Sequence, residues 1–204
     1  EDATAGPAAE RREVEIVNSE IADIQGSEEF TDRVQADLDL FAASPTGRQM
    51  LENLEQRMAE SREDDLLVNR ELIVREFDER NGQASSDYGD ATVSLNPEYR
   101  GSSGRPAVVF YHELAHAYDY LNNTGEGGSH VNPADPDYDD KGKPVDKDER
   151  QAVGLPIDSA HHGTVPDPEV RFEVDPEHPI QFTENGLRAE FGLGPRKQYG
   201  SPTK

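Results

Sequence analysis

Two histidines four residues apart, with a glutamate directly after the first, are the residues of this sequence best placed to do chemistry. They are His112, Glu113 and His116, within the stretch VVFYHELAHAYDY at residues 108–120. On a helix, residues four apart lie on one face, so both imidazoles can bind the same metal ion. Glu113 lies about 100° further round the helix, where its carboxylate can reach a metal-bound water without binding the metal.

This spacing suits zinc chemistry. Zinc binds neutral imidazole and lowers the pKa of its bound water to about 7, and a nearby carboxylate can take the water's proton as a general base. The alternative is an ordinary amphipathic helix that happens to contain two histidines. Val108, Val109, Phe110 and Leu114 are apolar, so we expect a buried helix, and buried histidines need partners. We therefore interpret the stretch as a catalytic metal helix.

A catalytic zinc ion takes three protein ligands and leaves one position for water. The chain has no cysteine, so the third ligand must be His, Asp or Glu. We favour Glu149, on a predicted short helix in DKDERQAVGLP whose small residue Ala152 lets it pack closely on the metal helix. Asp119, three residues after His116, can also bind directly. We expect it instead to orient a histidine ring as a hydrogen-bond acceptor.

Other possible metal ligands lie in polar loops. His130, His161 and His162 are expected to be exposed to solvent. The segment 135–146, DPDYDDKGKPVD, has carboxylates at alternate positions. An EF-hand loop needs glycine at the sixth position and glutamate at the twelfth, and both positions hold aspartate here. We expect a solvated acidic loop rather than a calcium site.

Apolar periodicity predicts the elements that position these residues. The predicted helices are one from Ser27 through Phe41, one carrying Met50 to Met58, the metal helix from Pro106 to about Leu121, a short one capped by Asp146, and one over 182–193 capped by Thr183. The segment SPTG at 44–47 separates the first two. Strand-like patterns occur near 14–24, over 65–77, and at 91–95, ATVSL.

The 204-residue length fits one domain better than two. We expect flexible tails at 1–12 and 200–204 around a single domain over 13–199. Only 33 % of residues are apolar, which predicts a modest core. The longest apolar runs are a handful of residues, far short of the 18 or so that span a bilayer.

The net charge of −23, from 43 acidic and 20 basic residues, repels phosphate backbones and anionic lipids. We expect neither nucleic acid nor membrane as a partner, and a monomer acting on a protein or peptide. The chain begins at Glu1 without methionine or a signal peptide, so we expect a leader, tag or upstream domain to have been removed. Together with the absence of cysteine, this fits a protein secreted or delivered to a target cell.

Several motifs resemble, in order, those of the NleD-type zinc endopeptidases, effector proteases injected by bacterial pathogens. They are SPTG, ATVSLNP, FYHELAHAYD, DERQAVGLP, and FTENGLRAEFGL with PRKQY. The resemblance covers roughly residues 24–199. It implies an α+β, zincin-like fold with a small twisted sheet packed on the HExxH helix. It also implies His112, His116 and Glu149 as ligands of one zinc ion and Glu113 as general base.

Two residues near the C-terminus are candidates for stabilising the negative charge that develops on the attacked carbonyl during peptide hydrolysis. Arg188 can supply a fixed positive charge, and Tyr199 can donate its hydroxyl. The alternatives are a surface salt bridge for Arg188 and a packed aromatic ring for Tyr199.

A zinc endopeptidase is the leading hypothesis. One alternative is a catalytically silent binding protein on a zincin scaffold, although such a protein has no chemical need for Glu113. The other is a metal-free acidic interaction domain. If the chain is a protease, we expect strand 91–95 to form the sheet edge that pairs with extended substrate. We also expect the acidic loop 122–146 to line one wall of the cleft and favour Lys or Arg near the cut bond.

Overall fold

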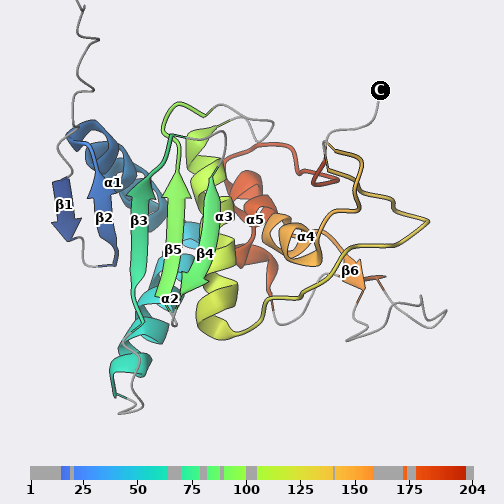
Figure 1. The fold of residues 1–204 in the computed structure, drawn as a ribbon, viewed down its shortest axis with the longest axis horizontal. Helices are drawn as coiled ribbons and strands as arrows, with labels where there is room; N and C mark the ends of the chain where they lie inside the picture. The colour runs from blue at the N-terminus through green and yellow to red at the C-terminus, as the bar shows by residue number, and fades with distance from the viewer. Residues whose placement is uncertain are drawn as a thin grey trace, which may run out of the picture.

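The fold combines α-helices with a mixed β-sheet (Figure 1). The computed structural model describes residues 15–18, 21–63, 70–78, 82–87, 90–99, 105–139, 141–158, 172–173 and 178–200. The predicted tail 1–12, the end of the predicted tail 200–204, and both His161 and His162 lie outside these ranges. The α+β class expected from the sequence is confirmed.

The main sheet has the strand order β1-β2-β3-β5-β4. Its strands are β1 (Glu15–Asn18), β2 (Asp23–Gly26), β3 (Leu72–Glu76), β4 (Gln83–Asp87) and β5 (Asp90–Leu95). The central strands β2, β3 and β5 run parallel, while β1 and β4 join them in antiparallel register. A second, two-stranded sheet pairs β6 (Ile157–Asp158) with β7 (Phe172–Glu173).

The predicted helices are all present, as α1 (Glu28–Ala43), α2 (Pro45–Glu63), α3 (Pro106–Asn122), α4 (Lys147–Val153) and α5 (Glu184–Glu190). Helix α2 begins at Pro45, so only Ser44 of the segment SPTG separates α1 from α2. Ser27 and Thr183 cap α1 and α5, each accepting a backbone N–H with its hydroxyl oxygen. Asp146 occupies the N-cap position of α4 without a side-chain cap bond.

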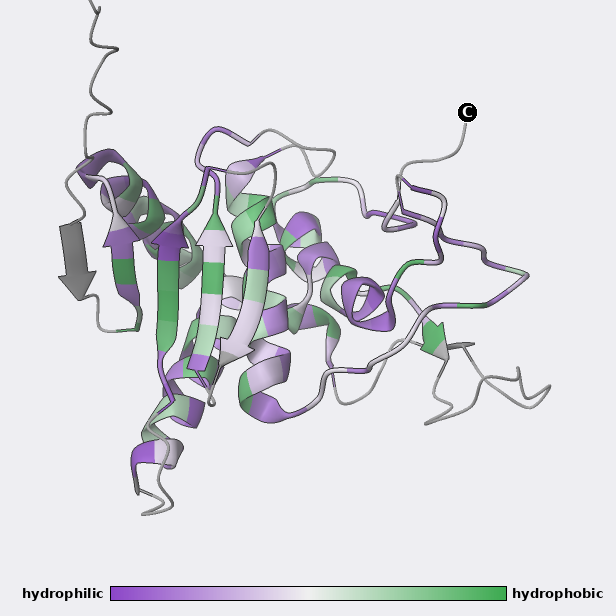
Figure 2. Cartoon of the chain, viewed as in Figure 1, coloured by the Kyte–Doolittle hydropathy of each residue, from purple (hydrophilic) through white to green (hydrophobic). Residues whose placement is uncertain are grey.

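The core lies between the sheet and the helices packed on one of its faces. β3 is apolar along most of its length (Figure 2), and Leu72 and Val74 turn their side chains into the core. Phe41 of α1 is fully buried, and its ring lies 5.6 Å from that of Phe110 and 5.2 Å from that of Tyr111, both on α3. These contacts join the N-terminal helices to α3.

Helix α3 is buried nearly all the way round. It packs against α2, against strands β4 and β5, and against the later helices α4 and α5. These contacts on several faces confirm the burial that the apolar residues of this helix predicted. The histidines His112 and His116 therefore lie inside the protein, each 6 % exposed.

The expectation that strand 91–95 forms the sheet edge is wrong. This strand is β5, which lies between β3 and β4, and the edge next to α3 is β4. The sequence of β4, QASSD, contains no β-branched or aromatic residue and no apolar alternation. Its strand structure comes from antiparallel pairing with β5 in the register Ala84↔Val93.

Across the described ranges, no helix is long and apolar enough to cross a membrane.

Replacing Phe41 by alanine should lower the free energy of unfolding by about 3–5 kcal/mol, because the substitution leaves a cavity between α1 and α3. The matched control is Leu40→Ala, one residue earlier on an exposed face, which should change stability by about 0.5 kcal/mol or less. Urea denaturation followed by circular dichroism measures both. Equal effects of the two substitutions would show that the Phe41 contacts do not hold the helices together.

Candidate metal centre

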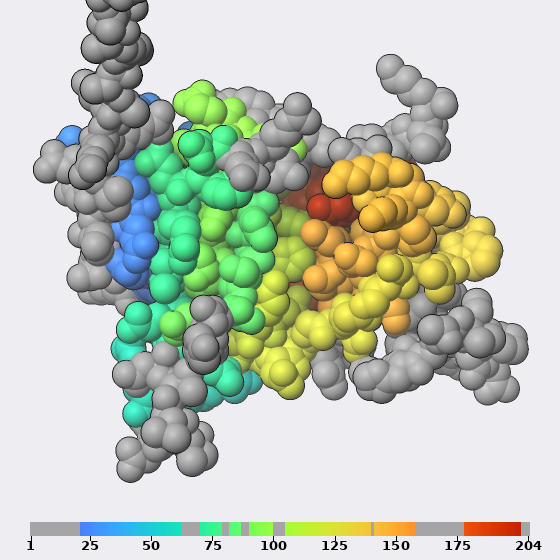
Figure 3. Space-filling view, viewed as in Figure 1, coloured from blue at the N-terminus to red at the C-terminus, as the bar shows by residue number. Residues whose placement is uncertain are grey.

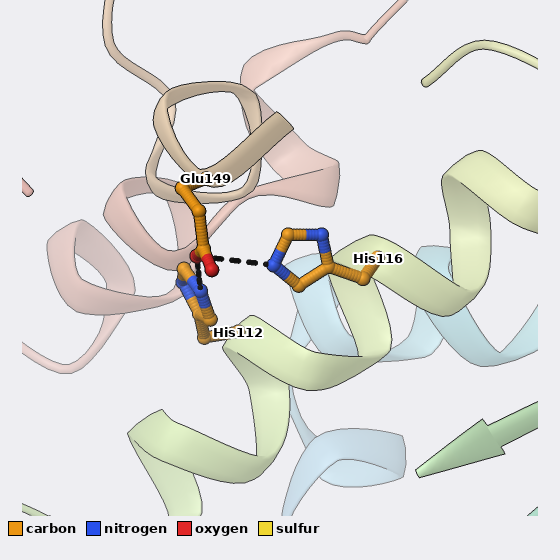
Figure 4. A group of neighbouring side chains, drawn as sticks. All are labelled: His112, His116 and Glu149. Atoms are coloured by element: carbon orange, nitrogen blue, oxygen red, sulfur yellow. Dashed lines mark hydrogen bonds and ion pairs between the residues drawn. The ribbon is translucent and has the colours of Figure 1, made fainter. Parts of the chain in front are cut away.

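His112, His116 and Glu149 meet where α4 crosses α3 (Figure 4). The two histidines lie one turn apart on α3, and their rings are 5.0 Å apart and nearly perpendicular. Glu149 comes from the first turn of α4. Its Oε2 atom lies 3.0 Å from His112 Nε2 and 3.3 Å from His116 Nε2.

These separations fit a shared metal ion. Atoms that bind one tetrahedral zinc ion through bonds of about 2.0 Å lie roughly 3.3 Å from one another. The three ligand atoms all lie within 4.8 Å of each other. Two imidazoles and a carboxylate form a donor set that suits zinc and leaves a fourth position for water. The three residues therefore fit a zinc ion in composition and in spacing.

The protonation of the three residues is strongly coupled. Burial would raise the pKa of Glu149, but hydrogen bonds and charges from both histidines outweigh it and lower that pKa. Burial would lower the pKa of His112, yet the carboxylates of Glu149 and Glu184 raise it. Without a metal ion, the buried carboxylate is thus balanced by protonated imidazole. A divalent cation can take over this role by displacing the protons.

Glu113 is buried beside the histidines and points toward strand β4. Its carboxylate accepts a hydrogen bond from the backbone N–H of Ala84. Gly82, just before β4, packs so closely that an added Cβ would lie 2.7 Å from the Glu113 side chain. Burial is the main cause that raises the pKa of Glu113, and the two histidines oppose it. A raised carboxyl pKa suits a group that both accepts and returns a proton.

Glu184 is a residue of the site that the sequence analysis missed. Its Oε2 atom lies 3.3 Å from His112 Nδ1 and accepts a hydrogen bond of 2.7 Å from Arg196. Although burial would raise the pKa of Glu184, contacts with His112 and Arg196 lower it. The ionised carboxylate favours a proton on His112 Nδ1, which leaves Nε2 free to bind a metal.

Arg188 faces Glu184 rather than the three candidate ligands. Its guanidinium lies 3.1 Å from Glu184 Oε1, and its Nε donates to the backbone oxygen of Gly194. Glu184 in turn contacts His112. Arg188 is therefore placed to hold the carboxylate that orients a candidate ligand, and its charge is already paired.

Tyr199 lies directly at the site, as its sequence position allowed. Its hydroxyl donates a hydrogen bond to the Glu149 carboxylate, and its ring lies 6.0 Å from the ring of His112. The pKa of Tyr199 is raised, first by burial and then by the charges of Glu149 and Glu113. The hydroxyl therefore stays protonated and can act as a donor. Arg196 also belongs to this group, with its guanidinium over the Tyr199 ring.

Asp119 does orient a histidine, but the wrong one for the expected role. Its Oδ1 atom lies 2.9 Å from Nδ1 of His178, and Thr124 donates a hydrogen bond of 2.7 Å to the same oxygen. His178 is buried and lies just before α5. Asp119 thus ties the C-terminal elements to the end of α3 and is not placed among the three ligand atoms.

The expectations for the loop after α3 are partly wrong. His130 is buried rather than exposed, and its Nε2 lies 2.8 Å from the backbone oxygen of Asp135. The acidic loop is not simply solvated, because Asp137 is buried against Arg150. Asp139 accepts N–H bonds from its own turn. Arg150 on α4 pairs with Asp137 and so holds this loop against the protein. No local pattern in the loop sequence predicts that Arg150 is the partner of Asp137.

The family comparison agrees with the motifs seen in the sequence. The Peptidase_M91 family model, described as Effector protein, matches residues 18–199. Searches of curated proteins and of solved structures give no significant match. The matched range includes all three candidate metal ligands, Glu113 and Tyr199.

Metal analysis should find one zinc ion per chain. Replacing His116 or Glu149 by alanine should remove most of the metal. A site with three protein ligands loses much of its affinity for zinc when any one of these ligands is removed. Asp119→Asn serves as the control, since it leaves the three ligand atoms in place. Mass spectrometry of the dialysed proteins measures the zinc content. Retention of zinc by Glu149→Ala together with its loss from Asp119→Asn would show that the third ligand is wrongly assigned.

Proposed function

The chain belongs to the Peptidase_M91 family of effector proteins, an NleD-type metallopeptidase family, and from this we propose that it is a zinc-dependent endopeptidase. Family membership makes it a protease with a protein substrate. The zinc ion, the roles of individual residues and a zincin-like classification of the fold are parts of the proposal. The family also supports delivery of the protein into a host cell as an effector.

One observation carries the proposal. Three potential zinc ligands converge on one point, and a buried carboxylate with a raised pKa follows the first ligand on the same helix. A silent scaffold or a metal-free interaction domain needs neither feature. Such a set of buried titratable groups is costly to maintain and is typical of catalytic sites.

When bound, a zinc ion supplies Lewis acidity toward the peptide carbonyl and lowers the pKa of a coordinated water. Glu113 then acts as general base by accepting a proton from the attacking water on its carboxylate. Its later donation of that proton to the leaving nitrogen completes hydrolysis. The Ala84 amide and the close approach of Gly82 hold this carboxylate in place. Because burial raises the pKa of Glu113, this pKa lies closer to the pH at which the protein would work.

Tyr199 is the chain's own donor for the charge that develops on the attacked carbonyl oxygen. Its hydroxyl remains protonated and lies beside Glu149. The guanidinium of Arg196 lies over the Tyr199 ring and pairs with Glu184. We assign Arg188 to positioning Glu184 rather than to direct contact with the substrate, because its guanidinium is committed to that carboxylate.

The β4 edge is the proposed binding surface for an extended substrate. It is the outer strand of the sheet beside α3, and edge strands bind peptides through main-chain hydrogen bonds. In Figure 3, atoms of the C-terminal part of the chain (red) are visible between this side of the sheet and the orange segment of α4. Because the backbone of Ala84 on β4 bonds to Glu113, which follows His112 on α3, a peptide along β4 would pass close to the general base.

Glu113→Gln should keep zinc bound but lower the cleavage rate by about 10²–10⁴-fold, because the amide fills the same space and cannot accept the proton. Glu52→Gln makes the same chemical change at an exposed position of α2 and should leave the rate unchanged. Cleavage of a fluorogenic peptide chosen by library profiling, together with zinc analysis, measures both effects. Near-normal turnover of the zinc-loaded Glu113→Gln protein would count decisively against the mechanism.

We expect a preference for Lys or Arg near the cut bond. The paired aspartates of the loop contribute little, but Asp148, directly before Glu149, is only partly buried and acts electrostatically on His116 and Tyr120. The preference should weaken as salt rises, because exposed charges are screened over about 8–10 Å. Asp148→Asn should weaken it too, while Asp32→Asn on α1 should not. A salt-independent cleavage profile without basic residues would contradict this expectation.

A further inference from the structure

The last described segment of the chain, residues 194–200, runs along the candidate metal centre, and we call it the C-terminal strap. Two α5 residues hold its first part. Arg188 donates to Gly194, and Asn185 makes two hydrogen bonds to the backbone of Arg196. The strap ends with Tyr199 and Gly200. Arg196, which pairs with Glu184 of α5, donates to the backbone oxygen of Tyr199, but the backbone N–H groups of Tyr199 and Gly200 bond elsewhere. The position of the Tyr199 hydroxyl therefore also depends on a second anchor.

We propose that Asp137 is this anchor and is a positioning residue for catalysis. Its side chain is almost completely buried. Asp137 Oδ2 accepts the backbone N–H of Tyr199 at 2.7 Å, and Oδ1 accepts that of Gly200 at 3.0 Å. The carboxylate thus grips two successive amides of the strap. Asp137 is not a catalytic residue, since it contacts the backbone of Tyr199 and not the reacting groups.

Arg150 connects this anchor to the metal site. It is fully buried on α4, and its guanidinium donates to Asp137 Oδ2 at 2.6 Å. The preceding residue on the same helix is Glu149, which accepts the hydroxyl of Tyr199. One short helix therefore holds Tyr199 from both ends, through Glu149 at its hydroxyl and through Arg150 and Asp137 at its backbone. Such charge-assisted bonds are short and strongly directional.

The close fit of Gly200 supports a rigid anchor. A Cβ atom added to Gly200 would lie 1.8 Å from the backbone oxygen of Tyr138, which no side chain can tolerate. The strap backbone therefore lies directly against the loop residue that follows Asp137. This contact gives a second way to displace the strap without changing any charged group.

The first test is hydrogen exchange of the strap amides, which needs neither metal nor substrate. In Asp137→Asn, one carboxylate oxygen becomes an NH₂ group that cannot accept an N–H. Exchange in residues 194–200 should therefore accelerate about tenfold or more, because the amides lose an acceptor. Gly200→Ala should have the same effect. The control is Asp135→Asn, which changes the other carboxylate that accepts a hydrogen bond from Arg150, at 2.6 Å. Unchanged exchange in both test variants would overturn the anchor.

The second test separates positioning from general stability and rests on the proposed protease function. Tyr199→Phe should lower kcat about 100-fold, as expected for loss of one donor to the developing charge. Asp137→Asn should lower kcat in the same direction while zinc content stays at the wild-type level. Because both changes remove the same contribution, the double variant should be no slower than Tyr199→Phe alone. Gly200→Ala should behave like Asp137→Asn, and Asp135→Asn should retain wild-type kcat.

The outcomes are distinct. Multiplicative losses in the double variant, or a normal kcat in Asp137→Asn and Gly200→Ala, would show that Asp137 does not position Tyr199. Failure of the wild-type protein to cleave any library peptide would contradict the proposed function instead. Hydrogen exchange would still decide whether Asp137 anchors the strap.

Discussion

Buried carboxylates that need buried partners determine how this site is built. Glu149 lies between two imidazoles, Glu184 faces His112 and two arginines, and Asp137 faces Arg150. Removing one member of such a pair costs about 3–5 kcal/mol, because the remaining charge is left without compensation. The chain has 43 acidic and 20 basic residues. With so few cations, the placement of three arginines around one site fixes which segments can meet there.

These pairs bring separate parts of the chain onto one helix. α3 contributes the two histidines and Glu113, α4 contributes Glu149 from 37 residues beyond His112, and α5 contributes Glu184. The strap then adds Tyr199. α3 can receive all of them because it is buried between the sheet and the other helices. Most of these side chains are buried, and in such surroundings charges act strongly on one another.

The candidate general base and the sheet edge are also physically connected. Glu113 accepts the amide of Ala84, and Tyr120 of the same helix donates to the Ala84 carbonyl at 3.5 Å. β4 is therefore held against α3 through its backbone rather than through apolar side chains. In the proposed protease, the strand that receives the substrate also holds the base, so the two are aligned by the same contacts.

The sequence alone determined the features that depend on residues within about one helical turn of each other. The HExxH spacing placed His112 and His116 on one face, and Ser27 and Thr183 marked helix starts. It also indicated Glu149, because a cysteine-free chain leaves few ligand types and its short helix is apolar on one side. Only the tertiary structure decided that β4 is the edge strand and that Glu184, Arg196 and Asp137 support the site. The physical reason is that these features depend on pairs far apart in the chain. A polar strand such as QASSD has no apolar periodicity that would predict it. The sequence around a buried charged residue does not show which distant residue will pair with it.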